Sequence, residues 1–314
     1  MRRSTFSAVD ACIAMAAAMF VVIALISFCQ AAEPDAPLPG HAEKVLGTPH
    51  FYQCDPDGQF ADDGRNYCLP VSVSDSLVFL ASHGFPHLLP GGTTDATAAQ
   101  IALIKTLASS ECMRTDPASG TDAGPACVGI QRYVQSAGYV CRSIEYKGWR
   151  PMPNALAAYA TATLPSLDWI KQATADPSAA AWVNIGWYVA GANPNEWKRV
   201  GGHWVAVVGY GTDGAGQADP NVLLIDNPAI SASITPAGHQ LADGTESPTR
   251  AEVAADVMTV SQATQGRLVG NYRGLPRDAA GMYRVSGQGV HMSKSYDAAF
   301  IDGAIVMVIG QRQP

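Results

Sequence analysis

Basic residues are scarce in this sequence. It contains 20 Lys and Arg against 27 Asp and Glu, so its formal net charge at pH 7 is -7. It has no stripe of Lys and Arg that could neutralise a row of phosphates, and we therefore expect no nucleic-acid partner. Charged residues make up only 15% of the 314 residues and hydrophobic residues 47%, which is enough for a sizeable buried core.

Motifs for metals and nucleotide cofactors are also lacking. No Cys-x-x-Cys pair and no His/Cys cluster has the spacing of a zinc site, so we expect no metal. Gly209–Gly214 matches the Gly-x-Gly-x-x-Gly pattern, but a dinucleotide site needs a helix directly after those glycines. Gly216, Asp219 and Pro220 follow instead, and this favours a hairpin turn and no cofactor.

The N-terminus has the pattern of an export signal. Arg2 and Arg3 precede an uncharged apolar run from Ile13 to Phe28, which is shorter than the ~20 residues of a spanning helix. Cys29–Ala31 offers small residues where a signal peptidase reads, so cleavage after Ala31 is expected. An uncleaved membrane anchor is the alternative interpretation.

We therefore expect three parts in the chain. They are a signal peptide (or uncleaved anchor) over 1–31, an N-terminal tail over 32–46 and a single domain over 47–314. The signal predicts export to the periplasm or the exterior, with contact to a membrane only if the signal stays uncleaved.

An odd number of cysteines remains after the signal: Cys54, Cys68, Cys112, Cys127 and Cys141. In an oxidising compartment an odd count leaves one thiol unpaired or joined to another chain. Cys112 and Cys127 flank a loop rich in Gly, Pro, Asp and Ser, so we expect these two to pair. If Cys68 is the free thiol, Cys54 pairs with Cys141.

Helical patterns come first in the chain and strand patterns follow. Periodicity predicts helices over 71–81, 97–107, 128–137 and 164–173, and strands over 139–146, 181–188, 203–210, 222–225 and 304–309. In the Ala-, Gly- and Ser-rich segment 230–289 a helix is expected only over 249–259. This order predicts the α+β class, with N-terminal helices packed on a C-terminal antiparallel sheet.

Cys68 stands where the first expected helix begins. Pro70 suits the first helical turn, and Val73, Leu77 and Leu80 then share one face of the helix. The unpaired amides and the dipole of a helix N-terminus stabilise a thiolate, so this position predicts a lowered thiol pKa. A disulfide cysteine beside a helix is the alternative interpretation.

Two further polar groups lie at the ends of expected strands. His203 opens an apolar strand after Gly201 and Gly202, and Asp226 and Asn227 end another strand before a proline. Alone, these would be a buried core histidine and an ordinary Asp-Asn-Pro turn. With Cys68 upstream they give the order Cys, His, Asn or Asp, in which an imidazole activates a thiol and a third group fixes the imidazole tautomer.

Four short stretches in this order resemble the papain-like cysteine peptidase superfamily, especially bacterial peptidases that process double-glycine bacteriocin leaders. The stretches are Phe51–Gln53, Tyr67–Pro70, Gly202–Gly209 and Ile225–Pro228. The resemblance implies a papain-like fold in which the nucleophile is Cys68, the base His203, the third triad member Asn227 (or Asp226) and the oxyanion donor Gln53. Leu69 departs from the family, which has glycine after the nucleophile, and Gln59 is an alternative to Gln53.

The predicted function is that of an exported thiol amide hydrolase, a cysteine peptidase acting on a peptide or protein substrate. Two alternatives stay open. The same fold could transfer acyl groups to amines, as transglutaminases do, or the chain could be a catalytically silent binding domain stapled by disulfides.

Overall fold

The computed structural model describes residues 40–41, 43–91, 95–212, 217–229, 257–270, 276–287 and 296–311. The chain divides into two compact units, Met1–Leu38 and Pro39–Pro314, and everything described here belongs to the second. The expected signal peptide lies outside the described residues. Within them, no helix is long and apolar enough to cross a membrane.

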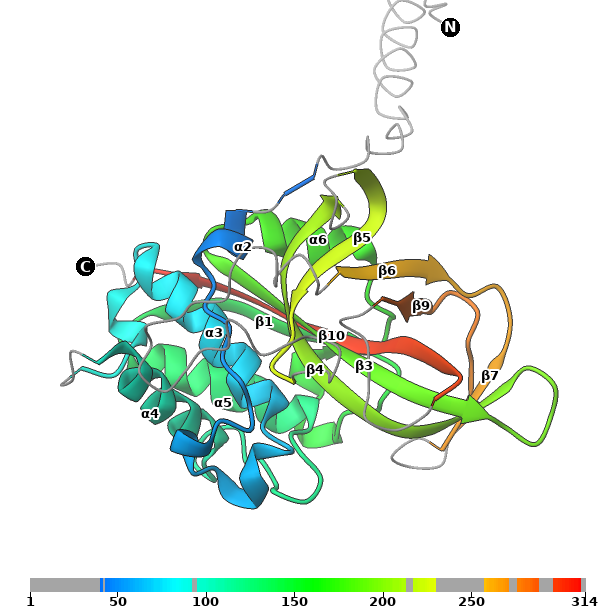
Figure 1. Cartoon of the computed structure of the whole chain (residues 1–314), viewed down its shortest axis with the longest axis horizontal. Helices are drawn as coiled ribbons and strands as arrows, with labels where there is room; N and C mark the ends of the chain where they lie inside the picture. The colour runs from blue at the N-terminus through cyan, green and yellow to red at the C-terminus, as the bar shows by residue number, and fades with distance from the viewer. Residues whose placement is uncertain are drawn as a thin grey trace, which may run out of the picture. The chain divides into compact units, whose positions relative to one another are not determined.

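The four predicted helices are present, each with somewhat different ends (Figure 1). The α-helices are α2 (Glu43–Gly47), α3 (Cys68–Ser82), α4 (Ala96–Ala108), α5 (Ala123–Ser136) and α6 (Leu167–Ala175). Short 3-10 turns are η1 (Pro56–Gly58), η2 (Ala61–Gly64), η3 (Pro86–Leu88) and η4 (Asn154–Tyr159). Helix α5 begins at Ala123, earlier than the predicted start at 128. The prediction missed its first turn because Gly124 and Pro125 are typical of a loop, but proline is well tolerated in a first helical turn.

The strands form one 10-stranded sheet. They are β1 (Val140–Gly148), β2 (Ala160–Thr161), β3 (Ala179–Ala190), β4 (Glu196–Thr212), β5 (Ala218–Asp226), β6 (Val257–Gln262), β7 (Arg267–Val269), β8 (Arg277–Asp278), β9 (Tyr283–Ser286) and β10 (Ala298–Gly310). The α+β class is therefore present. The sheet is mixed rather than purely antiparallel, since β1 pairs with β2 and β4 with β7 in parallel.

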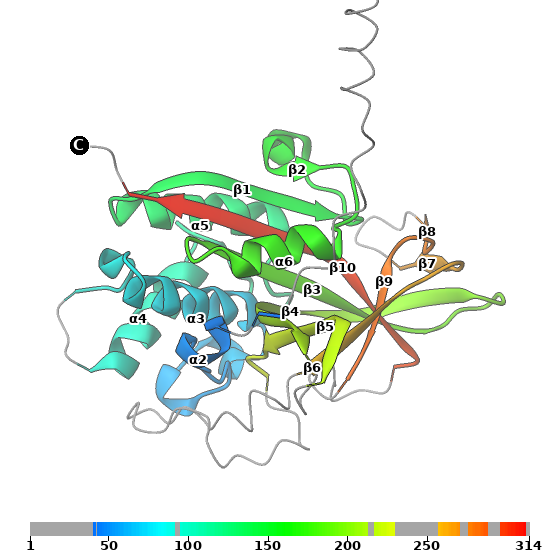
Figure 2. The same cartoon turned by 90° about the horizontal axis from the view of Figure 1, so that it is seen from above.

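The ladder pairs of the sheet close into a ring. Strand β10 pairs with β3, β3 with β4, β4 with β5, β5 with β6, β6 with β9, and β9 with β10 again. Figure 2 shows the short strands of this ring at the end of the molecule away from α3 and α4. Because β6 supplies Val257–Gln262, the predicted helix over 249–259 is wrong at 257–259, and its remaining residues lie outside the described ones.

The main hydrophobic core lies between helices α3, α4 and α5 and one face of the sheet. Its fully buried side chains include Leu77, Leu80, Leu103, Ile130, Trp182 and Met307. Each large apolar side chain buried in this way contributes about 1.5–3 kcal/mol. Helix α3 thus has a fixed position on the sheet, and so does its first residue, Cys68.

Helix α3 begins against an edge of β4 that β5 leaves open. The last ladder pair between the two strands joins Ala206 to Asp226, so no described strand pairs with His203–Val205 on that side of β4. The Ser72 hydroxyl donates to the Trp204 carbonyl at 3.3 Å, and the Trp182 indole N–H donates to the Ser72 carbonyl at 3.1 Å. These bonds hold the first turns of α3 on β3 and β4.

Part of the expected N-terminal tail packs on the body of the protein. The backbone N–H and carbonyl of His41 both pair with Tyr210, each at 2.8 Å. The buried Lys44 ammonium donates to the carbonyls of Ala179 at 2.6 Å and Ala173 at 3.1 Å. The compact unit accordingly begins before residue 47.

Candidate functional site

His203 and Asn227 form a buried hydrogen-bonded pair, with His203 in the middle of β4 and Asn227 directly after β5, so His203 does not open its strand as the sequence predicted. His203 Nε2 lies 2.7 Å from Asn227 Oδ1, which also accepts the backbone N–H of Ala229 at 2.9 Å. Because the Ala229 N–H can only donate, the Asn227 atom is an oxygen and His203 Nε2 carries the proton of a neutral ring. The other ring nitrogen, Nδ1, then presents a lone pair.

The surroundings of His203 keep its ring neutral. The ring stacks on the indole of Trp187, with centroids 5.7 Å apart, and the residue is only 6% exposed. Burial lowers the pKa of His203 to about 4, and the hydrogen bond that its Nε2–H donates to Asn227 opposes this shift in part. A neutral imidazole at pH 7 can accept a proton, which a general base must do.

Cys68 is the first residue of α3, and its sulfur lies against β4. The backbone N–H of Trp204 hydrogen-bonds to the Cys68 sulfur, which places the thiol beside the residue that follows His203. Burial raises the pKa of the Cys68 thiol to about 11, although this bond and the amides of Cys68 and Leu69 oppose the shift. The sequence-based expectation of a lowered pKa is therefore wrong, because desolvation outweighs the helix N-terminus.

Cys68 is linked to β4 through the backbone of Trp204 rather than through the ring of His203. No hydrogen bond joins the Cys68 sulfur to the His203 ring in the described part of the chain. The side chains of His203 and Trp204 point to opposite faces of β4, since strand residues alternate. Nucleophile–base contacts are often longer in substrate-free enzymes and tighten when substrate binds.

Gln53 is bonded both to the segment that precedes Cys68 and to the residue that follows Asn227. The Gln53 backbone N–H donates to the Pro228 carbonyl at 2.9 Å, and its side-chain Nε2 donates to the Arg65 carbonyl at 2.9 Å. The Gln53 side chain also hydrogen-bonds to the Cys54 thiol, so its amide group contacts both Arg65 and Cys54. Gln59 is exposed and ends η1 in a left-handed conformation, with φ 46°.

Asp226 faces away from His203 and joins a buried acidic pair that sequence reasoning missed. Its Oδ1 lies 2.5 Å from His50 Nδ1, and its carboxyl group hydrogen-bonds to that of Asp75 on α3. Gln100 Nε2 donates to Asp75 Oδ1 at 2.5 Å. Burial, then the charge of Asp226, raises the pKa of Asp75 well above its ordinary value, so Asp75 is the protonated partner that donates to Asp226.

Sequence patterns gave little sign of this pair. Asp75 falls inside an apolar helix and His50 precedes the Phe51–Gln53 stretch, but their partners are separated from them by up to 176 residues. One signal was available, because a charged residue in a helix that is otherwise apolar and small must find a partner when buried.

All five cysteines after the expected signal are free thiols, so neither predicted disulfide is present. The Cys112 thiol donates to the Gly129 carbonyl at 3.2 Å instead of pairing with Cys127. The Cys127 thiol interacts electrostatically with Cys141 on the adjacent strand, because α5 packs on β1. Cys54 interacts with Tyr52 and Arg65, away from Cys141.

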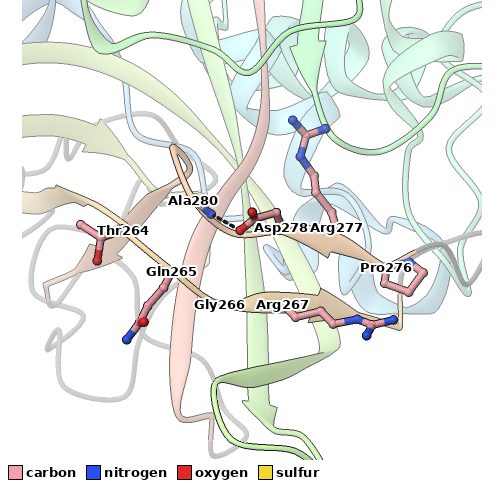
Figure 3. Close-up of a pocket in the computed structure, with 8 residues that line it drawn as sticks. All are labelled: Thr264, Gln265, Gly266, Arg267, Pro276, Arg277, Asp278 and Ala280. Atoms are coloured by element: carbon pink, nitrogen blue, oxygen red, sulfur yellow. Dashed lines mark hydrogen bonds between the residues drawn. The ribbon is translucent and has the colours of Figure 1, made fainter.

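A hollow on the β7–β8 side of the molecule is lined by residues 264–267, 276–278 and Ala280 (Figure 3). The only bond drawn there joins the Ala280 backbone N–H to Asp278, and the side chains of Arg267 and Arg277 point apart. No cluster of three or more His, Cys, Asp or Glu side chains suited to a metal occurs among the described residues. The hollow therefore adds no functional group to the Cys68 site.

Among the predicted site residues, His203 and Asn227 are joined by a hydrogen bond, Gln53 is bonded to Pro228 beside Asn227, and Cys68 contacts the backbone of Trp204; Asp226 has His50 as its partner and Gln59 is exposed. Comparison of the chain with protein-family models, with curated proteins and with solved structures finds no match.

Proposed function

We propose that this chain is a papain-like thiol amide hydrolase that cleaves peptide or protein substrates outside the cytoplasm. The observation that carries the proposal is the bond from His203 Nε2–H to Asn227 Oδ1, which leaves Nδ1 as a base on the strand whose next residue, Trp204, contacts the Cys68 sulfur through its backbone. The bond gives His203 the fixed tautomer that a general base requires.

In the proposed mechanism, Cys68 Sγ gives its proton to His203 Nδ1 and attacks the carbonyl carbon of a substrate amide. The resulting oxyanion accepts hydrogen bonds from the Cys68 backbone N–H and from the Gln53 side-chain N–H that in the resting protein contacts the Cys54 thiol. His203 then returns the proton to the leaving amine, so that an acyl thioester forms on Cys68. Water activated by His203 hydrolyses this thioester and restores the thiol.

The raised pKa of the Cys68 thiol and the lowered pKa of His203 define the resting state of this proposed pair. At pH 7 both groups are neutral, so proton transfer accompanies attack and no thiolate–imidazolium ion pair precedes it. Such a site reacts slowly with general alkylating reagents, since the thiolate is the reactive form.

A peptide-library digest tests the proposal. The protein is incubated with a mixture of unmodified peptides, and new termini are identified by mass spectrometry. We expect cleavage by wild type and none by Cys68→Ala, with Cys112→Ala as the matched control that retains activity. Cleavage that survives Cys68→Ala would refute the proposal. Repeating the digest with an added amine distinguishes hydrolysis from acyl transfer.

A further inference from the structure

A second site lies on the helix side of the sheet, where α5 begins. A cavity of about 320 Å³ opens there, and we call it the α5 pocket. The polar residues that line it are Arg114, Asp122, Arg150 and Asn184, and Met152 and Leu156 are among the apolar ones. Ligand pockets in proteins measure about 300–1,000 Å³, so this one suits a group the size of an amino acid.

Asn184 supplies a buried acceptor without a partner. The residue is 3% exposed, and its Nδ2 donates to the His203 carbonyl at 3.3 Å. Since that carbonyl can only accept, the remaining atom of the amide is the oxygen, Oδ1. Asn184 Oδ1 is buried and has no hydrogen-bond partner in the described part of the chain. A buried acceptor of this kind favours a ligand that brings an N–H group.

The N-terminus of α5 supplies donors and positive charge on another wall of the pocket. Helix α5 has 14 residues, and the side chain of its N-cap residue, Asp122, makes no capping hydrogen bond. Instead Asp122 pairs with Arg150 at 3.0 Å. Ala123 and Gly124 line the pocket, and as first-turn residues their N–H groups have no partner within the helix. Helix N-termini of this kind attract carboxylates.

The charges around the pocket sum to one positive unit. Arg114 and Arg150 are cationic, and Asp122 is the one acidic residue among those that line the cavity. A ligand carboxylate at the start of α5 would therefore meet two amide donors and Arg150, while sharing Arg150 with Asp122.

We propose that the α5 pocket binds an apolar amino-acid residue through its carboxylate and its N–H group. The carboxylate lies at the amides of Ala123 and Gly124 and at Arg150, the N–H donates to Asn184 Oδ1, and the side chain packs on Met152 and Leu156. A free amino acid and the C-terminal residue of a peptide share this chemistry. The site goes beyond the proposed hydrolase activity and does not depend on it.

The pocket is nevertheless connected to the candidate active site. Asn184 donates to the backbone of His203, and the ring of Trp204 lines the pocket while its backbone N–H bonds to the Cys68 sulfur. A ligand in the pocket would therefore hold the segment of β4 that carries both groups.

Titration calorimetry with four small probes tests the proposal on the full chain and on the Cys68→Ala variant. We expect N-acetyl-L-leucine to bind at least about tenfold more tightly than N-acetyl-L-leucinamide, which lacks the carboxylate. The same factor is expected over 4-methylpentanoate, which lacks the N–H. Binding of L-leucine as well identifies the free amino acid as a ligand, and binding of the acetylated form alone identifies a peptide C-terminus.

Variants provide the matching evidence from the protein. Arg150→Gln and Asn184→Leu should each weaken N-acetyl-L-leucine by about tenfold or more, and Arg132→Gln, on α5 but outside the pocket, should leave binding unchanged. Asn184→Leu also removes a bond to β4 and could fail to fold. In that case the weaker binding of 4-methylpentanoate, which lacks the N–H group, tests the role of Asn184 Oδ1 on the wild-type protein. Absence of binding at 10 mM, or equal affinity for all probes, would overturn the proposal. Binding should be retained in Cys68→Ala, because the pocket does not depend on the proposed nucleophile. The pocket can therefore be tested even if the protein shows no hydrolase activity.

Discussion

At the scale of single residues, the candidate site combines a histidine whose tautomer is fixed by a hydrogen bond with a thiol that contacts backbone amides. Asn227 holds His203 through one short bond, while Cys68 depends on backbone amides alone. Asp226 and Asn227 have different partners, His50 and His203, in keeping with the alternation of side chains along a strand. The pKa of Cys68 could not be predicted, because burial depends on residues more than a hundred positions away.

Replacing Asn227 by Ala should lower the turnover rate by about 10- to 100-fold. The imidazole would lose the acceptor that fixes its tautomer, and a hydrogen bond of this kind is worth about 1.5–3 kcal/mol when the ring becomes charged. Turnover of the peptide found in the library digest provides the measurement. Asn227→Asp is the control, because it retains an acceptor at the same position. Equal rates for wild type and Asn227→Ala would show that Asn227 does not orient the base.

Acid should destabilise the protein through His203. Its pKa is lowered from an ordinary 6.5 to about 4, so the unfolded chain binds the proton first as pH falls. The stability that the neutral ring contributes is present above pH 6.5 and is lost as pH falls through 4, a total of ~3 kcal/mol. Urea unfolding between pH 7 and 4 measures it. The His203→Gln variant should lack this part of the pH dependence. If the free energy of unfolding changed with pH equally in wild type and His203→Gln, His203 would not be its source.

At the scale of elements, one buried acidic pair joins the three segments that build the site. Asp75 lies on α3, which begins at Cys68. Asp226 is the last residue of β5 and precedes Asn227, and His50 precedes the segment that carries Gln53. Helix and strand positions could be predicted from local periodicity, as α3 and α4 show. The contacts between these elements could not, because each joins residues far apart in sequence.

Replacing Asp75 by Ala should destabilise the fold by about 3 kcal/mol or more. The change would leave Gln100 and the Asp226 carboxylate without a buried partner. Asp75→Asn is the matched control, since its amide can accept from Gln100 and donate to Asp226 as the protonated acid does. Chemical denaturation at neutral pH measures both, and a loss of equal size in the two variants would contradict the shared proton.

The same pair makes a prediction about pH. The pKa of Asp75 is raised above an ordinary 3.8, so above that pH the folded protein holds a proton that the unfolded chain has lost. The contribution of Asp75 to the free energy of unfolding is therefore highest at low pH and decreases as pH rises. Wild type should therefore lose stability relative to Asp75→Asn as pH rises from about 4. Urea midpoints of the two proteins across this range check the trend, and a constant difference would refute it.

At the scale of the whole molecule, the ring of ladder pairs is tied together by a buried aspartate. Asp302 on β10 is fully buried and accepts from Trp149 Nε1 at 2.9 Å, from the Tyr188 hydroxyl at 2.5 Å and from Arg199 Nε at 2.6 Å. These partners come from β3, β4 and the segment after β1. The sequence predicted the α+β class from the order of its patterns but not the ring, because strands β6 to β9 are short and give weak periodicity.

Replacing Arg199 by Met should destabilise the fold by about 3–5 kcal/mol. It would leave the Asp302 charge buried without its cationic partner. The double variant Arg199→Met/Asp302→Asn should recover part of this loss, because it removes the charge as well. Guanidinium unfolding of the two variants measures the difference. A single-variant loss below about 1 kcal/mol would show that the ion pair does not hold β10 to β4.

The central claim, that His203 takes the proton of Cys68, is tested most directly by the burst of p-nitrophenol from p-nitrophenyl acetate. Wild type should release one equivalent per chain and carry one acetyl group on Cys68, as located by peptide mass mapping. The burst rate should fall by about 100-fold or more in His203→Ala and the burst should vanish in Cys68→Ala. A burst that is equally fast in wild type and His203→Ala, or an acetyl group on another cysteine, would contradict the account.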